Sequence, residues 1–178
     1  MTRRTCLLGA LALVMAAGTV GRAAETLRIV PIASDHTVVV SVELSDAYND
    51  DIRQAISSGL RTQFTYDIEL RMDVPVWVDP IIATVAVNIS DQYDNLTRRH
   101  SLSRTIDGRV QDALTTEDDT VARQWLTTLT RLPLCETSKL DPTRDYYVRI
   151  SARARPYGNS MLGWASAVTG QAKFTFIP

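Results

Sequence analysis

A stretch of nearly strict alternation, LRTQFTYDIELRM from Leu60 to Met72, constrains this chain more than any other segment. Its apolar side chains fall on every second position, at Phe64, Tyr66, Ile68, Leu70 and Met72. A period of two predicts a β-strand with one face buried and the charged face directed outward. The segment YYVRISARARP, residues 146–156, alternates in the same way and predicts a second such strand.

The segment SDAYNDDIRQAISSG changes to a helical period and predicts a helix near residues 46–58. Ser45 or Asp46 is expected to cap this helix, because a side-chain oxygen there can accept a free backbone N–H. Gly59 is suited to end the helix in a left-handed conformation. The long alternating strand follows at once, so the sequence predicts a compact helix–glycine–strand unit.

The segment TTEDDTVARQWLTTLTRLP predicts a second helix near residues 117–131. Thr116 and Asp119 have the spacing of a capping box, with Asp in place of the usual Glu. Pro133 is expected to stop the helix. Its apolar face is expected to consist of Val121, Trp125, Leu129 and Leu132.

The remaining segments are expected to be short strands joined by turns, in the order β-β-α-β-β-β-α-β-β. Pro75 and Pro80 bracket Trp77 and interrupt the pairing of strands there. Turn-linked strands favour an α+β fold, a mainly antiparallel β-sheet with two α-helices against it. A β-sandwich with helical crossovers is the alternative. Residues 24–178 are expected to form one domain.

The first 23 residues have the layout of a secretory signal peptide. Arg3 and Arg4 precede an apolar run from Cys6 to about Val20, and Gly21 and Ala23 suit a cleavage site. We therefore expect residues 1–23 to be removed and the domain to reside in the periplasm or outside the cell. Removal leaves one cysteine, Cys135, so we expect no internal disulfide. Its thiol is expected to be buried, with pairing between chains as the alternative.

Charge is unevenly distributed along the chain. Residues 25–94 contain 12 acidic and 4 basic side chains, whereas residues 95–178 contain 8 acidic and 12 basic ones. In one compact domain, we expect the two halves to pair with each other. The net charge of −1 makes nucleic-acid binding an unfavoured function.

Three segments carry a family resemblance: VSVELSDAYNDDIRQAISSGLRTQFTYDIELR, DNLTRRHSLSR followed by DG, and KLDPTRDYYVRISARA. With these segments in this order, the chain resembles a bacterial exported family known as domain of unknown function 4390, roughly over Leu27 to Ala154. The resemblance implies a cell-envelope protein of unknown activity. In many bacteria the family sits near a membrane sensor kinase of the nitrogen-regulation type. The resemblance therefore implies such a kinase as a candidate partner. It supplies no catalytic residues.

Catalytic and metal-binding patterns are sparse. His36 and His100 are the only histidines, and both are expected to be exposed or at strand ends. A metal site needs closely spaced ligands, and a nucleophilic Cys135 needs a nearby histidine. We therefore expect no cofactor and no metal, and we expect a non-catalytic interaction module. A hydrolase whose site the sequence does not reveal is the alternative.

The outward face of the strand near residues 146–156 is basic. Arg149, Arg153 and Arg155 share this face with Tyr147, and they form the candidate site for an anion or a partner. A carboxylate, a phosphate or an anionic lipid headgroup at a membrane surface would suit such a stripe. In the alternative interpretation, these arginines only pair with carboxylates of the first alternating strand across a ladder.

Overall fold

The computed structural model describes residues 27–34, 36–157 and 167–175. These residues form nine strands and two α-helices. In chain order, the elements are β1 (Leu27–Ser34), β2 (Thr37–Leu44), α1 (Asp50–Ser57), β3 (Thr62–Met72), β4 (Ile81–Asp94), β5 (Arg99–Ile106), β6 (Arg109–Thr116), α2 (Asp119–Thr127), β7 (Thr128–Glu136), the 3-10 helix η1 (Thr137–Lys139), β8 (Asp145–Pro156) and β9 (Val168–Thr175). The segment expected to be a signal peptide lies outside the described residues.

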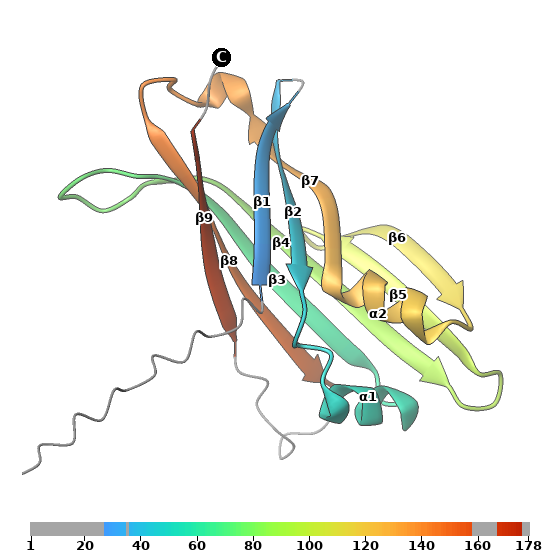
Figure 1. Ribbon diagram of the computed structural model, residues 1–178. Helices are drawn as coiled ribbons and strands as arrows, with labels where there is room; N and C mark the ends of the chain where they lie inside the picture. Colours follow the sequence, from blue (N-terminus) through green and yellow to red (C-terminus); the bar gives the residue numbers. More distant parts are fainter. Residues whose placement is uncertain (1–26, 35, 158–166, 176–178) are drawn as a thin grey trace, which may run out of the picture.

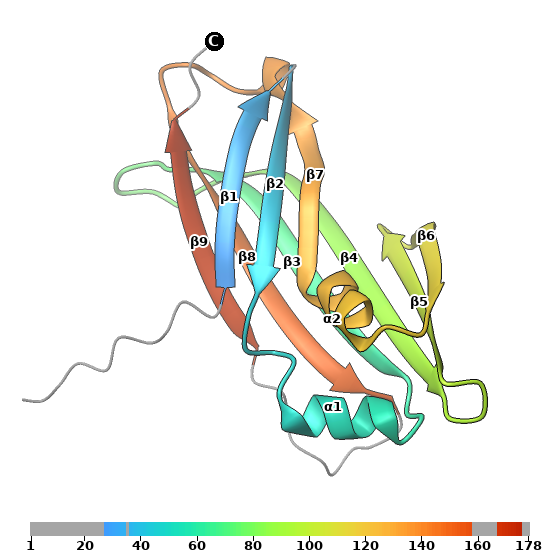
Figure 2. The same ribbon diagram turned by 45° about the vertical axis from the view of Figure 1, so that its right-hand side comes forward.

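The strands form two antiparallel sheets. The larger sheet has the order β6-β5-β4-β3-β8-β9, and the smaller has the order β1-β2-β7. The smaller sheet lies over one face of the larger one (Figures 1 and 2). The predicted α+β class with mainly antiparallel sheets and two helices is confirmed. The two helices flank this layered core, and no described helix is long and apolar enough to cross a membrane.

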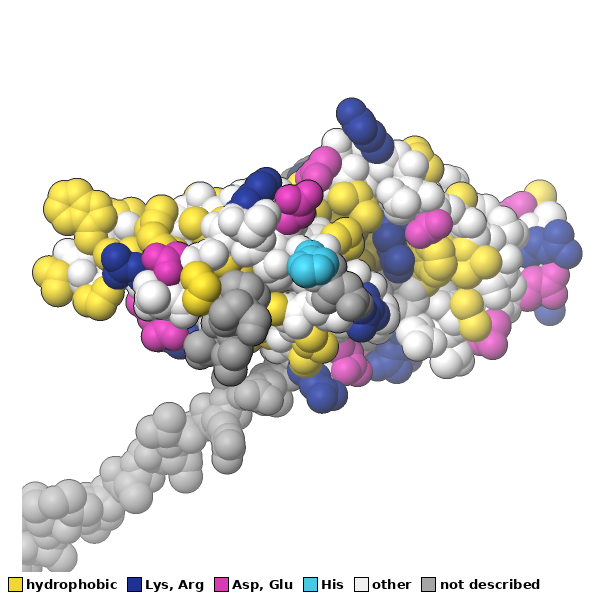
Figure 3. All heavy atoms as spheres, turned by 90° about the horizontal axis from the view of Figure 1, so that it is seen from above, with side chains coloured by type: hydrophobic (Ala, Val, Ile, Leu, Met, Phe, Trp, Pro, Cys, Tyr) yellow, Lys and Arg dark blue, Asp and Glu magenta, His cyan; other side chains and the backbone are white. Residues whose placement is uncertain are grey.

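The loop between β3 and β4 extends beyond the end of the larger sheet (Figure 1). It contains the predicted interruption around Pro75 and Pro80. Apolar side chains gather at the same end in the space-filling view (Figure 3). Val76, Trp77 and Val78 are among the most exposed large apolar residues of the described chain.

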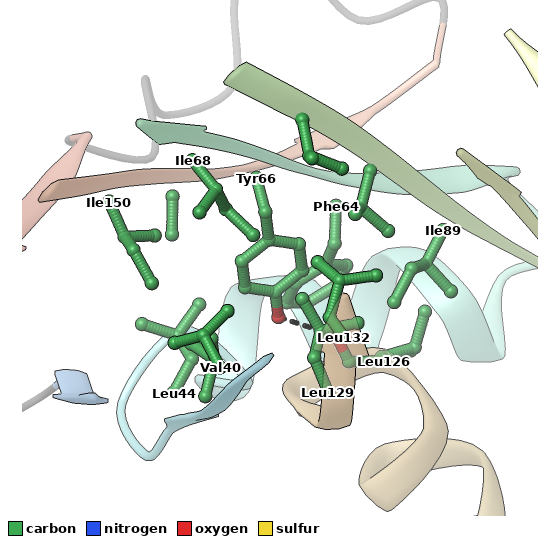
Figure 4. Close-up of a cluster of buried hydrophobic side chains, with 14 of the residues drawn as sticks. Val40, Leu44, Phe64, Tyr66, Ile68, Ile89, Leu126, Leu129, Leu132 and Ile150 are labelled. Atoms are coloured by element: carbon green, nitrogen blue, oxygen red, sulfur yellow. Dashed lines mark hydrogen bonds between the residues drawn. The ribbon is translucent and has the colours of Figure 1, made fainter. Parts of the chain in front are cut away.

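The core lies between the two sheets and confirms the alternation predicted for residues 60–72. Phe64, Tyr66, Ile68 and Leu70 of β3 are all fully buried. They pack with side chains of β2, β4, β7 and β8 (Figure 4). Burial of one such side chain contributes about 1.5–3 kcal/mol. This inward face therefore dominates the stability of the larger sheet.

Helix α1 starts later than predicted but ends as predicted. Its cap is Asn49, whose Oδ1 accepts the N–H of Ile52 at 2.9 Å, so the expected caps Ser45 and Asp46 are wrong. Gly59 follows the helix with φ of +82°. The N–H of Gly59 donates to the carbonyl of Ile56, and the N–H of Leu60 donates to that of Ala55. These two bonds form a Schellman ending, for which glycine is favoured.

Helix α2 is shorter than predicted, because the chain enters strand β7 at Thr128 rather than continuing to residue 131. Leu129 pairs with Val42, Leu132 with Val40, and Cys135 with Val38. From each of these pairs to the next, β7 advances three residues and β2 advances two, so two bulges interrupt the ladder. The bulges leave Leu129 and Leu132 both buried, which reproduces a helical spacing within a strand. Pro133 lies at the second bulge, where a proline is tolerated.

Strand β6 was also absent from the predicted order. Its residues are mostly exposed, since it is the edge strand of the larger sheet and pairs with β5 alone among the described strands. An exposed edge strand does not require alternating apolar residues. The period-two pattern on which the prediction depended is therefore missing there.

Candidate functional site

A histidine held between two carboxyl groups lies near the helical end of the molecule. Nδ1 of His100 is 2.8 Å from Oδ2 of Asp91, and its Nε2 is 2.8 Å from Oδ1 of Asp119. Asp91 and His100 come from the adjacent strands β4 and β5, and Asp119 is the first residue of α2. The ring of Tyr93 packs on the imidazole at a centroid distance of 4.7 Å.

His36 is exposed, as expected. His100 lies next to the start of β5, which agrees with the expected strand-end position, but its side chain is buried and only 1% exposed. The turn at Asp94–Asn95 places Tyr93 opposite His100 in the ladder and puts Asp91 on the same inward face. The sequence does contain a signal for this site. Pairing the two strands residue by residue outward from the turn places His100 and Asp91 on the same face.

The start of α2 supplies the second carboxylate. Asp118 caps the helix, with its Oδ1 accepting the N–H groups of Thr120 at 2.7 Å and of Val121 at 3.4 Å. The predicted capping box of Thr116 and Asp119 is therefore wrong. Freed from capping, the carboxylate of Asp119 reaches His100 and fastens α2 to the larger sheet.

The surroundings of His100 favour its protonated form. Burial lowers the pKa of His100, but hydrogen bonds to Asp119 and Asp91 and their charges outweigh burial, so the pKa lies above its usual value. Burial raises the pKa of Asp91, and the hydrogen bond with His100 opposes this effect only in part. Oδ1 of Asp91 is buried and lacks a hydrogen-bond partner within the described chain.

A cleft of about 600 Å³ opens beside this cluster, between the two helices and the larger sheet. Its lining includes Tyr48, Arg53, Tyr93 and Arg123 in addition to His100 and Asp119. Burial, together with the charge of Asp119, raises the pKa of Tyr48. A general base needs a ring nitrogen that is free to accept a proton, and both nitrogens of His100 already face carboxyl groups.

The described part of the chain offers little evidence for a metal site or a reactive thiol. Within it, no group of three or more His, Cys, Asp or Glu side chains could hold a metal ion. Cys135 lies on β7, is half-buried, and has a pKa raised by burial, which disfavours a reactive thiolate.

The predicted basic stripe lies on the outer face of the larger sheet. Arg149, Arg153 and Arg155 alternate along β8 with buried residues and share one exposed face. Nη2 of Arg153 is 2.5 Å from Oδ2 of Asp67 on β3. Arg149 lies opposite Glu69 in the ladder, although Glu69 pairs with Arg71 at 2.8 Å.

The structure separates Tyr147 from two of the three predicted arginines. Tyr147 lies near the β3–β4 loop, where its hydroxyl donates to Oδ2 of Asp79 at 2.7 Å. Arg155 lies eight residues further along β8, which is about 26 Å for an extended strand. Arg153 and Arg155 therefore lie together at the far end, while Tyr147 does not join them.

A shallow hollow of about 440 Å³ lies over that far end of β3 and β8. It is lined by Gln63, Thr65, Arg153, Arg155 and Tyr157. Gln63 and Thr65 both bond to Oδ1 of Asn88, at 2.9 and 3.0 Å, so the floor of the hollow is fixed. Arg155 has no carboxylate partner among the residues that the structure describes, and its charge is directed to the hollow and to solvent.

Comparison with known proteins identifies the family. The chain belongs to the family described as Domain of unknown function (DUF4390), which matches residues 22–156. No curated protein and no solved structure matches the chain. The family resemblance predicted from the sequence is therefore confirmed, and the match includes the strands that carry the hollow and the helix that carries Asp119.

Proposed function

We propose that this protein is an exported, non-catalytic binding module of the cell envelope, and that the hollow around Arg153 and Arg155 holds an anionic group of its partner. The observation that carries the proposal is the hollow with the guanidinium of Arg155 in its wall, which has no carboxylate partner in the described part of the chain. The arrangement of the first 23 residues supports export.

The chemistry of the hollow suits a carboxylate or a phosphate. A guanidinium presents a planar fork of donors that matches either anion in a bidentate manner. Arg153 and Arg155 are two residues apart on one face of β8, so their Cα atoms lie about 7 Å apart. Arg153 is tethered by Asp67, which leaves Arg155 as the freer of the two donors.

The partner that best fits this proposal is an envelope protein with an exposed acidic or phosphorylated group. A membrane sensor kinase is the candidate implied by the family resemblance. The same chemistry would also take an anionic lipid headgroup, so the experiment below separates the two sources.

The test is affinity capture from envelope extracts with the mature protein as bait. The variant carries Arg153→Ala and Arg155→Ala, and the control carries Arg109→Ala, an exposed arginine on edge strand β6. We expect capture of one partner by the wild type and the control, and its loss in the double variant. Vesicles of phosphatidylcholine with and without phosphatidylglycerol form the lipid arm. Equal capture by all three proteins, with no anion-dependent vesicle binding, would contradict the proposal.

A hydrolase remains the second candidate, because Asp91 and His100 lie beside a cleft with shifted pKa values. In that case a substrate must displace Asp119 from Nε2 of His100 to free a base. The test is turnover of a panel of ester and amide substrates by the wild type and by His100→Gln. Activity that disappears in the variant would favour the enzyme over the binding module.

A further inference from the structure

The loop between β3 and β4 presents an apolar tip with no role in the core. We define the tip loop as Val74–Val78, five consecutive residues without a charge. Trp77 is 80% exposed and Val78 is 77% exposed, while Val76 is fully exposed. The other strongly exposed apolar residues in described hairpin turns, such as Leu96, stand alone among polar neighbours, so the tip loop is a concentration of apolar surface.

The base of the tip loop is firmly anchored. The carboxylate of Asp79 accepts the N–H of Val74 at 3.0 Å and the hydroxyl of Tyr147 at 2.7 Å. Just below, Asp73 pairs with Lys173 of β9 at 2.5 Å. The apolar side chains are thus held out from the sheet by a polar base, and they do not fold back onto it.

The backbone at the tip is held in an unfavourable conformation. Val76 has φ of +68°, a value that a β-branched side chain rarely adopts. Glycine or asparagine would satisfy this geometry without strain. A valine that is fully exposed in a strained position gains nothing from the fold, which points to a role for its side chain outside the molecule.

The tip loop also has few backbone donors to satisfy. The N–H of Val74 donates to Asp79, the N–H of Trp77 donates to the carbonyl of Val74 at 3.4 Å, and Pro75 has no N–H. Unpaired backbone groups are the main cost of moving a loop into an apolar medium. Two of the four backbone N–H groups of this loop, those of Val74 and Trp77, are therefore paired within the protein and do not oppose transfer out of water.

We propose that the tip loop inserts into the surface of a lipid bilayer. Tryptophan favours the interface between headgroups and hydrocarbon, and the flanking valines would enter just below it. The pair of Asp73 and Lys173 would remain at headgroup level. A narrow convex tip suits a bilayer better than a protein interface, which buries about 800 Å² on each partner.

This proposal rests on the proposed export, which brings the domain to a membrane surface, but it does not rest on the arginine hollow. Gln63 lies next to the start of β3 and Met72 ends the strand, nine residues or about 30 Å away. Insertion of the tip loop would therefore leave the hollow facing away from the bilayer. The domain would stand on the membrane and offer its basic end to a partner.

The test measures partition of the mature protein into phosphatidylcholine vesicles by co-sedimentation, with tryptophan quenching by brominated acyl chains as a second readout. We expect binding without anionic lipid and with little dependence on salt. Replacing Val76, Trp77 and Val78 by serine should weaken partition by at least about tenfold. Trp77→Phe should retain binding and lose most of the quenching. Circular dichroism verifies that each variant is folded.

Matched controls distinguish membrane binding by the tip loop from nonspecific hydrophobic adsorption and from binding by the arginine hollow. Leu96→Ser and Val110→Ser remove exposed apolar residues from other hairpins and should leave partition unchanged. Arg153→Ala with Arg155→Ala should also leave it unchanged. The proposal is overturned by a wild type that does not partition, by a serine variant that partitions equally, or by quenching that persists in Trp77→Phe. Loss of a captured protein by the serine variant, without vesicle binding by the wild type, would assign the tip loop to a protein pocket instead.

Discussion

Tyr66 places a hydroxyl in the centre of the core and uses it to hold α2. Its hydroxyl group donates a hydrogen bond to the carbonyl of Leu126 at 2.6 Å, and the ring is fully buried (Figure 4). Tyr66→Phe keeps the ring but leaves that carbonyl without its donor, so we expect a loss of about 1–2 kcal/mol of unfolding free energy. Urea denaturation measures it. Tyr157→Phe, at an exposed tyrosine, should change stability by less than about 0.5 kcal/mol. Equal effects of the two substitutions would show that the buried bond contributes nothing.

His100 should make stability depend on pH. The pKa of His100 is raised in the folded state, so the folded state binds the proton more tightly than the unfolded state does. This contribution is fully present below the unfolded pKa, about 6.5, and is lost as pH rises through the folded pKa. We expect the stability difference between the wild type and His100→Gln to shrink as the pH rises from about 6.5, the unfolded pKa, through the raised pKa of the folded state. Thermal denaturation across this range measures it.

His36 offers the control for that experiment. It is exposed in the turn between β1 and β2, and His36→Gln should retain the pH dependence of the wild type. A difference between the wild type and His100→Gln that grows with pH would contradict the assignment of His100 as the stabilising cation.

Single residues differ in how well the sequence predicted them. The inward positions of β3 were predictable because alternation is a local pattern that burial imposes directly. The environment of His100 was not, because it depends on the register of two strands and on which aspartate caps α2. Asp118 and Asp119 are equivalent by composition, and only the structure distinguishes the cap from the ligand of His100.

At the scale of elements, β7 shows why a periodic pattern can mislead. Leu129, Leu132 and Cys135 recur every three residues, which is typical of a helix face. Two bulges produce the same spacing in a strand, and Arg131 has φ of +49° at the first of them. Bulges depend on pairing with β2, a tertiary contact that a local pattern does not contain.

The end of α1 carries a prediction at this scale. Gly59 and Gly108 both have positive φ, +82° and +79°. A Cβ added at Gly59 would lie 3.3 Å from Nδ2 of Asn95, whereas a Cβ added at Gly108 would have no atom within 4 Å. Each Gly→Ala change should cost about 1–2 kcal/mol for the left-handed conformation. We expect Gly59→Ala to cost more than Gly108→Ala, as measured by urea denaturation. Equal costs would show that the left-handed conformation alone decides, and the reverse order would contradict the role given to Asn95.

For the whole molecule, the predicted pairing of the two halves takes place across β3 and β8. These strands are neighbours, and the pair of Arg153 with Asp67 joins the acidic half to the basic half. Both side chains are about half exposed, so Arg153→Ala should reduce stability by only about 0.2–1 kcal/mol. Urea denaturation at low and high salt measures it. A larger loss would mean that the pair organises the fold and would weaken its role in binding.

The candidate site was predictable only in part, because it depends on which strands are neighbours in the sheet. Alternation placed Arg149, Arg153 and Arg155 on one face of β8, but the hollow also depends on Gln63 and Thr65 of the neighbouring strand. Strand order is a global property, so the sequence left open which end of the stripe faced a concave surface. Tyr147 shares the face and is bonded to Asp79 at the other end.

The bulges of β7 also determine where the length of this chain can vary. Deleting Thr130 or Arg131 would remove the extra residue between Leu129 and Leu132 and return the strand to a period of two. The two leucines would then lie two positions apart on the same inward face, and the residues beyond them would keep their partners on β2. A deletion within the regular strand β3 would instead move every residue beyond it to the other face. Relatives shorter by one residue at this bulge should therefore keep the apolar pattern of β7 on both sides of the gap.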